Sequence, residues 1–139
     1  MIDNKIILSG KEASNDLGLA ALQLFFWQFA KLVLPPFLKA LCEPEQLAAI
    51  KIRNQKSIMG SCSQKPGCKP AINLNWRAIF LPKSMLLHLC LHELTHIRHM
   101  SHGQDFYRSL EKVSANCKLK EKELNNAWKT LPAWIHWRI

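Results

Sequence analysis

Residues 92–103 are His-Glu-Leu-Thr-His-Ile-Arg-His-Met-Ser-His-Gly, and this stretch decides how the rest of the chain is interpreted. It begins with the pattern HExxH. Two histidines four positions apart lie on one face of an α-helix, about 6 Å apart along its axis, so both imidazoles can bind one metal ion. Glu93 can then reach a water molecule at that ion without being a ligand itself. The pattern predicts a metal site on a helix, with His92 and His96 as ligands.

The residues around HExxH support this interpretation, because they are strongly apolar. Met85-Leu86-Leu87 and Leu89-Cys90-Leu91 precede the motif, and Leu94 lies within it. A surface helix that carried two histidines by chance would have more polar neighbours. We therefore expect a helix over about 83–99 that is buried behind a site, with Cys90 as a small core residue.

A catalytic zinc site needs three protein ligands and one open position. In an unbroken helix, His88 and His99 lie about 10–12 Å along the axis from the more distant HExxH histidine, too far to share an ion with it. His102 qualifies only if the chain turns back. The segment 101–103 permits such a turn, because Gly103 accepts backbone angles that other residues avoid. We favour His102 over the remaining candidates, which are His88, His99 and His136.

The chemistry expected of this site is hydrolysis. Zinc lowers the pKa of a bound water, and Glu93 is the candidate general base that takes its proton before attack on a carbonyl. Tyr107 and Arg77 are candidates for stabilising the developing oxyanion or binding substrate. An exposed strand edge over 71–79 would hold an extended peptide by strand addition. The site predicts a zinc metallohydrolase, with a peptide or protein as the first choice of substrate.

The remaining pattern predicts an α+β fold in a single domain, 1–139. A helix is expected over 14–34, ended by Pro35-Pro36, and a short second helix over about 37–50. Strands are expected over 50–59 and 71–81, joined by a hairpin loop over 60–70. Three further helices are expected over 83–99, 104–117 and 121–129. The apolar stretch from Leu17 to Leu34 contains Gln23, Gln28 and Lys31, so we interpret it as a core helix and expect no membrane span.

The charge balance suggests a second class of partner. The chain has 19 Lys and Arg against 10 Asp and Glu, a formal net charge of +9. Such a charge favours association with nucleic acid. The basic residues are scattered, however, and the densest group, over 112–122, is interrupted by glutamates in the manner of a solvated helix face.

The cysteines are five in number and form no CxxC pair. Cys62 and Cys68 are close enough in sequence to form a disulfide or to bind a second metal, although two thiols without nearby partners make a poor zinc site. The N-terminal residues lack the basic flank of a signal sequence. We therefore expect a reducing, cytoplasmic location.

Three segments together resemble a known family: Lys56-Ser57-Ile58-Met59-Gly60-Ser61-Cys62-Ser63, Ile72-Asn73-Leu74-Asn75-Trp76-Arg77, and residues 92–102 followed by Phe106. They closely resemble the YgjP-like metallopeptidases over about 37–137, and that family is similar in turn to the SprT-like proteins. The resemblance implies a minimal zincin-like domain, with a small antiparallel sheet packed against the HExxH helix and flanking helices. It also implies that His102 is the third zinc ligand.

The sequence departs from the family pattern at three places. Met59 stands where the family usually has Trp, Tyr107 stands where Trp usually follows Phe, and residues 65–69 lengthen the hairpin. These departures affect the substrate groove more than the metal site.

Two alternative functions remain open at this stage. Members of the resembled family have been suggested to hydrolyse nucleoside triphosphates, although no Gly-rich phosphate loop is present here. The SprT-like relatives act on DNA-bound proteins, so a DNA-associated protease or a non-catalytic nucleic-acid-binding module is the other alternative.

Overall fold

The computed structural model describes residues 15–136, and its first element is the long helix α1 (Asn15–Lys39). The helix continues through Pro35 and Pro36, so the predicted end at these prolines is wrong. A proline inside a helix costs about 3 kcal/mol, because it removes a hydrogen bond and crowds the preceding turn. Leu34 and Leu38, on either side of the prolines, are completely buried, and each contributes about 2 kcal/mol or more by its burial. Packing on both sides therefore offsets the cost of the prolines.

Helix α1 packs along one side only. By length and composition its residues Asp16–Lys39 would suffice to cross a membrane, and 17% of its most apolar window is buried. The predicted core helix thus contributes one face to the core, through Ala30, Leu34 and Leu38. The opposite face remains exposed.

A three-stranded sheet follows, formed by β1 (Ala49–Arg53), β2 (Gly60–Ser63) and β3 (Ala71–Asn75) in the order β1-β3-β2. Strand β2 pairs with β3 antiparallel, whereas β1 pairs with β3 parallel. The expected antiparallel sheet is therefore corrected to a mixed one, because the β2–β3 hairpin folds back so that β3 lies between the other strands. The predicted loop 60–70 is also wrong at its start, which forms β2.

The chain leaves β3 in a 3-10 turn, η2 (Trp76–Phe80), where the sequence predicted a longer strand. Asn75 explains the change. Its side-chain oxygen accepts a hydrogen bond from the Arg77 amide at 3.2 Å, and its side-chain nitrogen donates to the carbonyls of Gln55 and Ile58. The side chain that ends the strand thus also fixes the loop before β2.

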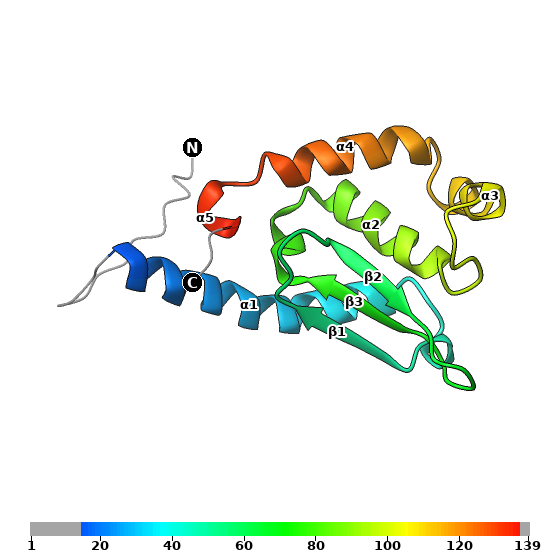
Figure 1. The fold of residues 1–139 in the computed structure, drawn as a ribbon, viewed down its shortest axis with the longest axis horizontal. Helices are drawn as coiled ribbons and strands as arrows, with labels where there is room; N and C mark the ends of the chain where they lie inside the picture. Colours follow the sequence, from blue (N-terminus) through cyan, green and yellow to red (C-terminus); the bar gives the residue numbers. More distant parts are fainter. Residues whose placement is uncertain (1–14, 137–139) are drawn as a thin grey trace.

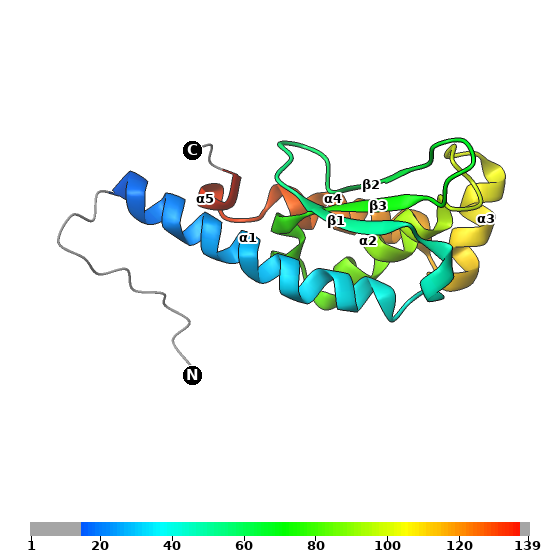
Figure 2. The same ribbon diagram turned by 90° about the horizontal axis from the view of Figure 1, so that it is seen from below.

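Four helices complete the described chain: α2 (Lys83–Thr95), α3 (Gln104–Val113), α4 (Cys117–Lys129) and the short α5 (Ala133–His136). A single 3-10 turn, η1 (Pro44–Gln46), connects α1 to the sheet. Figures 1 and 2 show α1 and α2 on the same face of the sheet, with α4 alongside α2 and α3 across its C-terminal end. The α+β class is confirmed.

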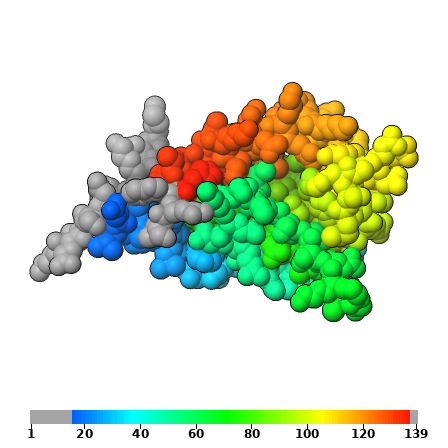
Figure 3. Space-filling model, in the orientation of Figure 1, coloured from blue at the N-terminus to red at the C-terminus, as the bar shows by residue number. Residues whose placement is uncertain are grey.

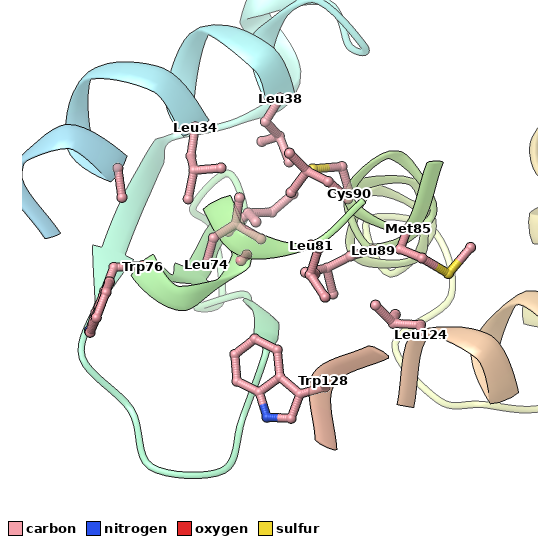
Figure 4. Packing of buried hydrophobic residues seen from close by; sticks show 14 of the residues in the cluster. Leu34, Leu38, Leu74, Trp76, Leu81, Met85, Leu89, Cys90, Leu124 and Trp128 are labelled. Atoms are coloured by element: carbon pink, nitrogen blue, oxygen red, sulfur yellow. The ribbon is translucent and has the colours of Figure 1, made fainter. Parts of the chain in front are cut away.

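The main core lies where α1, the sheet, α2 and α4 meet (Figure 4). Leu34 and Leu38 of α1 point towards Leu74 of β3 and Cys90 of α2, while Leu124 of α4 closes the other side. The burial of Cys90 confirms its predicted place in the core. This core holds α2 against the sheet, and the site residues on α2 project from the resulting rigid unit.

The α3–α4 junction depends on one carboxylate. Glu111 accepts hydrogen bonds from the backbone amides of Asn116 at 2.7 Å and Cys117 at 2.9 Å, at the start of α4. Asn116 itself is left-handed, with φ 58°. The hydrogen bonds from Cys117 and then Asn116 lower the pKa of Glu111 to about 2.

We expect Glu111→Gln to lower the melting temperature at neutral pH. Because the folded-state pKa of Glu111 is depressed, its contribution is fully present above the unfolded-state pKa of about 4.3 and is lost as the pH falls towards 2. The difference in melting temperature between the two proteins should therefore shrink over that window, as measured by circular dichroism. A difference that stays constant with pH would contradict this role.

Candidate metal centre

The last turn of α2 presents His92 and Glu93, and the C-cap residue that follows it is His96, at the end of the helix nearest α3. The His92 and His96 rings are 5.1 Å apart between centroids. Helix α2 ends at Thr95, and turn hydrogen bonds from the amides of residues 96–99 back to residues 93–95 complete its last turn. The chain then reverses, as the assignment of His102 required.

The reversal brings His102 to the other two histidines. The His102 ring centroid lies 5.1 Å from that of His92 and 4.6 Å from that of His96, and one ligand atom from each of the three histidines lies within 4.8 Å of the others. Gly103 is not what allows the turn, because its φ of −87° is open to any residue. The structure brings His102 together with His92 and His96, but the glycine argument for the turn is wrong.

The ring nitrogens of His92 and His96 are oriented by hydrogen bonds on their far sides. The Nδ1 atom of His92 lies 2.6 Å from Oε1 of Glu121, and Nδ1 of His96 lies 2.9 Å from the carbonyl oxygen of His99. A carboxylate and a carbonyl only accept, so both Nδ1 atoms carry the proton and donate. Both Nε2 atoms are then left with the lone pair that a metal requires.

The distance between two of the donor atoms is close to that expected for ligands of one tetrahedral ion. His92 Nε2 and His102 Nε2 are 3.1 Å apart. Two nitrogens that each bind zinc at about 2.0–2.1 Å with a tetrahedral angle are separated by roughly 3.3 Å. Burial, the largest cause in each case, lowers the pKa of both His92 and His96, which favours the neutral, ligating form.

Phe106, at the start of α3, packs against all three imidazoles. Its ring centroid lies 4.9 Å from His92, 4.5 Å from His96 and 4.9 Å from His102, and its side chain is completely buried. Phe106 therefore ties α3 to the site and keeps the histidine rings in place.

Glu93 is buried beside the histidines, with 5% of its surface exposed. Burial first, and then the charge of Glu121, raise its pKa to about 8. Its Oε2 atom has no hydrogen-bond partner within residues 15–136. A buried carboxyl oxygen without a partner is costly, and a bound ion or water is the kind of group that would satisfy it.

Gly60 on strand β2 makes room for this carboxyl group. A Cβ atom at position 60 would lie 3.1 Å from both Cγ and Oε1 of Glu93. A side chain at position 60 would therefore require the Glu93 carboxyl group to shift by a few tenths of an ångström.

Two cavities open beside the three histidines. One, of about 260 Å³, is lined by β2 residues 60–62 together with Glu93 and Met100. The other, of about 420 Å³, is bounded by residues 57–60, Tyr107 and Glu121. The site thus lies between the free edge of β2 and helix α4.

Comparison with known proteins agrees with this geometry. The family model described as the YgjP-like, metallopeptidase domain matches residues 3–127. The chain belongs to the YgjP-like metallopeptidase family. The three-histidine cluster therefore occurs in a chain of a metallopeptidase family. The match begins at residue 3, well before the stretch of about 37–137 over which the sequence motifs resemble the family.

One solved structure is similar to this YgjP-like chain in fold. It is the metallopeptidase zymogen of Pyrococcus abyssi abylysin, 22% identical, with a TM-score of 0.53 over 77% of this chain and 95% of that one. No curated protein matches the chain.

The structure does not bring Arg77 to the site. Its side chain donates to the carbonyls of Ile135 and Gln55 and to the side chain of Asn54, and it lies over the Trp76 ring. Arg77 lines neither cavity beside the histidines. It joins the loop before β2 to the C-terminal helix, and the prediction of an oxyanion role for it is wrong.

Tyr107 does lie at the site, on the wall of the larger cavity. Its hydroxyl oxygen is 3.5 Å from Oε2 of Glu121, and its ring stands 6.4 Å from the His102 ring. The hydroxyl therefore stays a candidate for contact with substrate.

The other sulfur and imidazole groups lie outside the cluster. Cys62 and Cys68 are free thiols, and His99 bonds to Ser109 Oγ through Nε2. His88 is buried, bonds to Ser114, and has its Nε2 4.0 Å from Glu121. A second cluster of His88, His92 and Glu121 is present, but the direct 2.6 Å contact between its last two members leaves no space for an ion between them.

Glu121 and Gly60 are two site residues that were not predicted from the sequence. Glu121 was interpreted as one charge on a solvated helix face, and nothing in its local pattern shows that α4 runs back along α2. Gly60 was assigned to a loop. The Ser-Cys-Ser run that follows it could have indicated a short strand.

We expect His102→Ala to reduce zinc affinity by more than the roughly 10–100-fold that loss of an outer contact costs. Replacement of one of three ligands leaves two, too few for a stable site. Elemental analysis of purified protein measures the loss. His99→Ala is the matched control, because its ring bonds to Ser109 instead, and near-normal zinc in His102→Ala would remove this residue from the ligand set.

Gly60→Ala should leave the zinc content unchanged but lower the rate constant of peptide hydrolysis by about tenfold, because the added methyl group displaces the Glu93 carboxyl group. The matched control is Gly103→Ala, where the nearest atom would lie 4.0 Å from the new Cβ. Equal activity of the two variants would show that the position of Glu93 does not depend on Gly60.

Proposed function

We propose that the chain is a zinc-dependent peptidase in which Glu93 is the general base. The observation that carries the proposal is the convergence of His92, His96 and His102 beside a buried carboxyl group with an unsatisfied oxygen. Three neutral imidazoles with one open position are the donor set of catalytic zinc. A bound zinc ion would acidify water and polarise the carbonyl of the scissile bond.

Glu93 is suited to accept the proton of the attacking water. It follows His92 on α2, so its carboxyl group faces the same space as the ligands, and burial raises its pKa to about 8. A nearby divalent charge opposes that shift and favours the carboxylate. Burial and a bound cation would therefore act on the pKa of Glu93 in opposite directions. A carboxyl group in this position can both accept and release a proton near neutral pH, as acid–base catalysis requires.

An extended peptide fits the edge of β2. This strand ends the β1-β3-β2 sheet, and its residues 60–62 line the smaller cavity with Glu93. The edge predicted over 71–79 belongs to β3, which is paired on both sides, so that prediction is corrected to β2. Backbone groups of a substrate would pair with β2 and place the scissile bond at the histidines.

The cavity linings favour a peptide over a nucleotide. Within the described chain, no Lys or Arg lines either of the two cavities. Arg108, Lys112 and Lys118 line a third, more open depression, which shares His102 and Tyr107 with the larger of the two cavities. Hydrolysis of nucleoside triphosphates, association with DNA and a cytoplasmic location stay predictions.

Glu93→Gln should retain zinc and lose peptidase activity by about 100-fold or more, because the amide cannot accept the proton. Cleavage of an unfolded protein substrate, followed by mass spectrometry at equal zinc occupancy, measures the effect. Glu123→Gln, an exposed change on α4, controls for the altered charge. Full activity of zinc-loaded Glu93→Gln would exclude the general-base role.

A further inference from the structure

One imidazole in the middle of α2 is buried but is not a candidate ligand of the metal centre. His88 is 1% exposed and lies one helical turn before His92, so both side chains are on the same side of α2. Helix α4 lies against α2 along the top of the molecule (Figure 3). The His88 ring contacts Ser114, just before α4, and lies close to Glu121 on α4. The ring is therefore enclosed where the two helices meet.

The contacts of Ser114 decide which nitrogen of His88 carries the proton. Ser114 Oγ lies 2.8 Å from His88 Nδ1 and 3.3 Å from Lys120 Nζ. A lysine ammonium only donates, so within residues 15–136 the serine hydroxyl can give its hydrogen only to His88 Nδ1. Burial, the largest cause, lowers the pKa of His88 and favours the neutral ring. A neutral ring that accepts at Nδ1 carries its proton at Nε2.

The Nε2–H group of His88 lies close to Glu121 without reaching it. Within the described chain the Nε2 atom is buried and has no hydrogen-bond partner, and its distance to Glu121 Oε1 is 4.0 Å. A buried donor without an acceptor is costly. A shift of about 1 Å would bring the two atoms to an ordinary hydrogen-bond distance. The contact of the same oxygen with His92 Nδ1, at 2.6 Å, has room to lengthen.

Glu121 needs a second close donor to stay in place. Its flexible side chain reaches across from α4 to His92, and its contact with the Tyr107 hydroxyl is 3.5 Å long. A carboxylate has about four lone-pair sites, so it can accept from several donors at once. Groups that hold a ligand ring from behind affect metal affinity. We propose that His88 is a positioning residue, whose Nε2–H group holds the Glu121 carboxylate against His92 and so orients the ligand ring.

The role of His88 rests on the proposed zinc site but not on peptide cleavage. His88 lines neither of the two cavities beside the three histidines. It acts through Glu121 and contacts neither the ion nor the substrate. Its effect should therefore appear in the affinity of the full chain for zinc, which is measured without any substrate.

Three substitutions separate the two nitrogens of the ring. Leucine fills the space without a polar group. The amide nitrogen of glutamine can take the place of Nε2 and donate to Glu121, whereas the shorter asparagine can replace only the contact of Nδ1 with Ser114. We expect His88→Leu and His88→Asn to weaken zinc binding by roughly tenfold, and His88→Gln to stay within about threefold of the unchanged protein. Competition with a chelator measures the dissociation constants.

A second test removes the acceptor. In a chain that carries Glu121→Ala, His88→Leu should have no further effect on zinc affinity, because the connection to His92 is already lost. Leu86→Ala is the matched control, since Leu86 is buried on α2 and belongs to the main core. It should lower the melting temperature of the zinc-free protein and leave the zinc affinity unchanged. Melting temperatures of all zinc-free variants report any loss of stability separately.

Equal zinc affinity of the three His88 variants and the unchanged protein overturns the proposal. So does an asparagine variant that binds zinc normally beside a glutamine variant that does not, because the ring would then act only through Ser114. An equal loss in His88→Leu with and without Glu121 would show that the effect does not pass through the carboxylate. A zinc-loaded protein without peptidase activity contradicts the proposed function alone and leaves the role of His88 intact.

Discussion

An imidazole can offer only one nitrogen to a shared ion, so the other nitrogen of each ring must be held by something else. The contact between His92 Nδ1 and Glu121 Oε1, at 2.6 Å, meets this requirement and joins α2 to α4. The bond from His96 Nδ1 to the His99 carbonyl does the same within the turn that ends α2. The fold provides a hydrogen-bond acceptor for the Nδ1 atom of each of these two rings, and their Nε2 atoms are then left for the shared ion.

Glu121 also influences the Glu93 carboxyl group. Its charge adds to burial in raising the pKa of Glu93, while the same charge partly opposes the effect of burial on His92. The Glu121 carboxylate thus orients the His92 ring and also raises the pKa of the neighbouring Glu93. A positive ion among the three histidines would be close to both acids and would relieve the repulsion between them.

The sequence was sufficient for the parts of the site that lie within one helix or one turn. HExxH has a fixed geometry on any helix, so His92, Glu93 and His96 follow from spacing alone. His102 followed from elimination, even though the turn is made by residues 96–99 and not by Gly103. The α+β class followed from the order of helical and strand patterns, in which the strands come after α1 and before α2 in the sequence.

What the sequence did not provide depends on contacts between distant segments. Pro35 and Pro36 normally end a helix, but burial of Leu34 and Leu38 against the sheet outweighs that preference. Glu121 reaches the site only because α4 runs back along α2, 29 positions away from His92 in sequence. Arg77 looked available for catalysis, yet the turn at Asn75 directs it to the loop before β2.

This distribution of contacts determines how the domain responds to its metal. Helix α3 buries only Phe106 and Leu110, and Phe106 packs against the three histidines themselves. The outer part of the site therefore rests on the imidazoles more than on the main core, whereas α2 is held by the sheet and α1. Metal binding would stabilise the fold through the segments that supply its ligands and their supports. Those segments are the end of α2, the turn at His102 and, through Glu121, helix α4, so loss of the metal should loosen α3 before it affects the sheet.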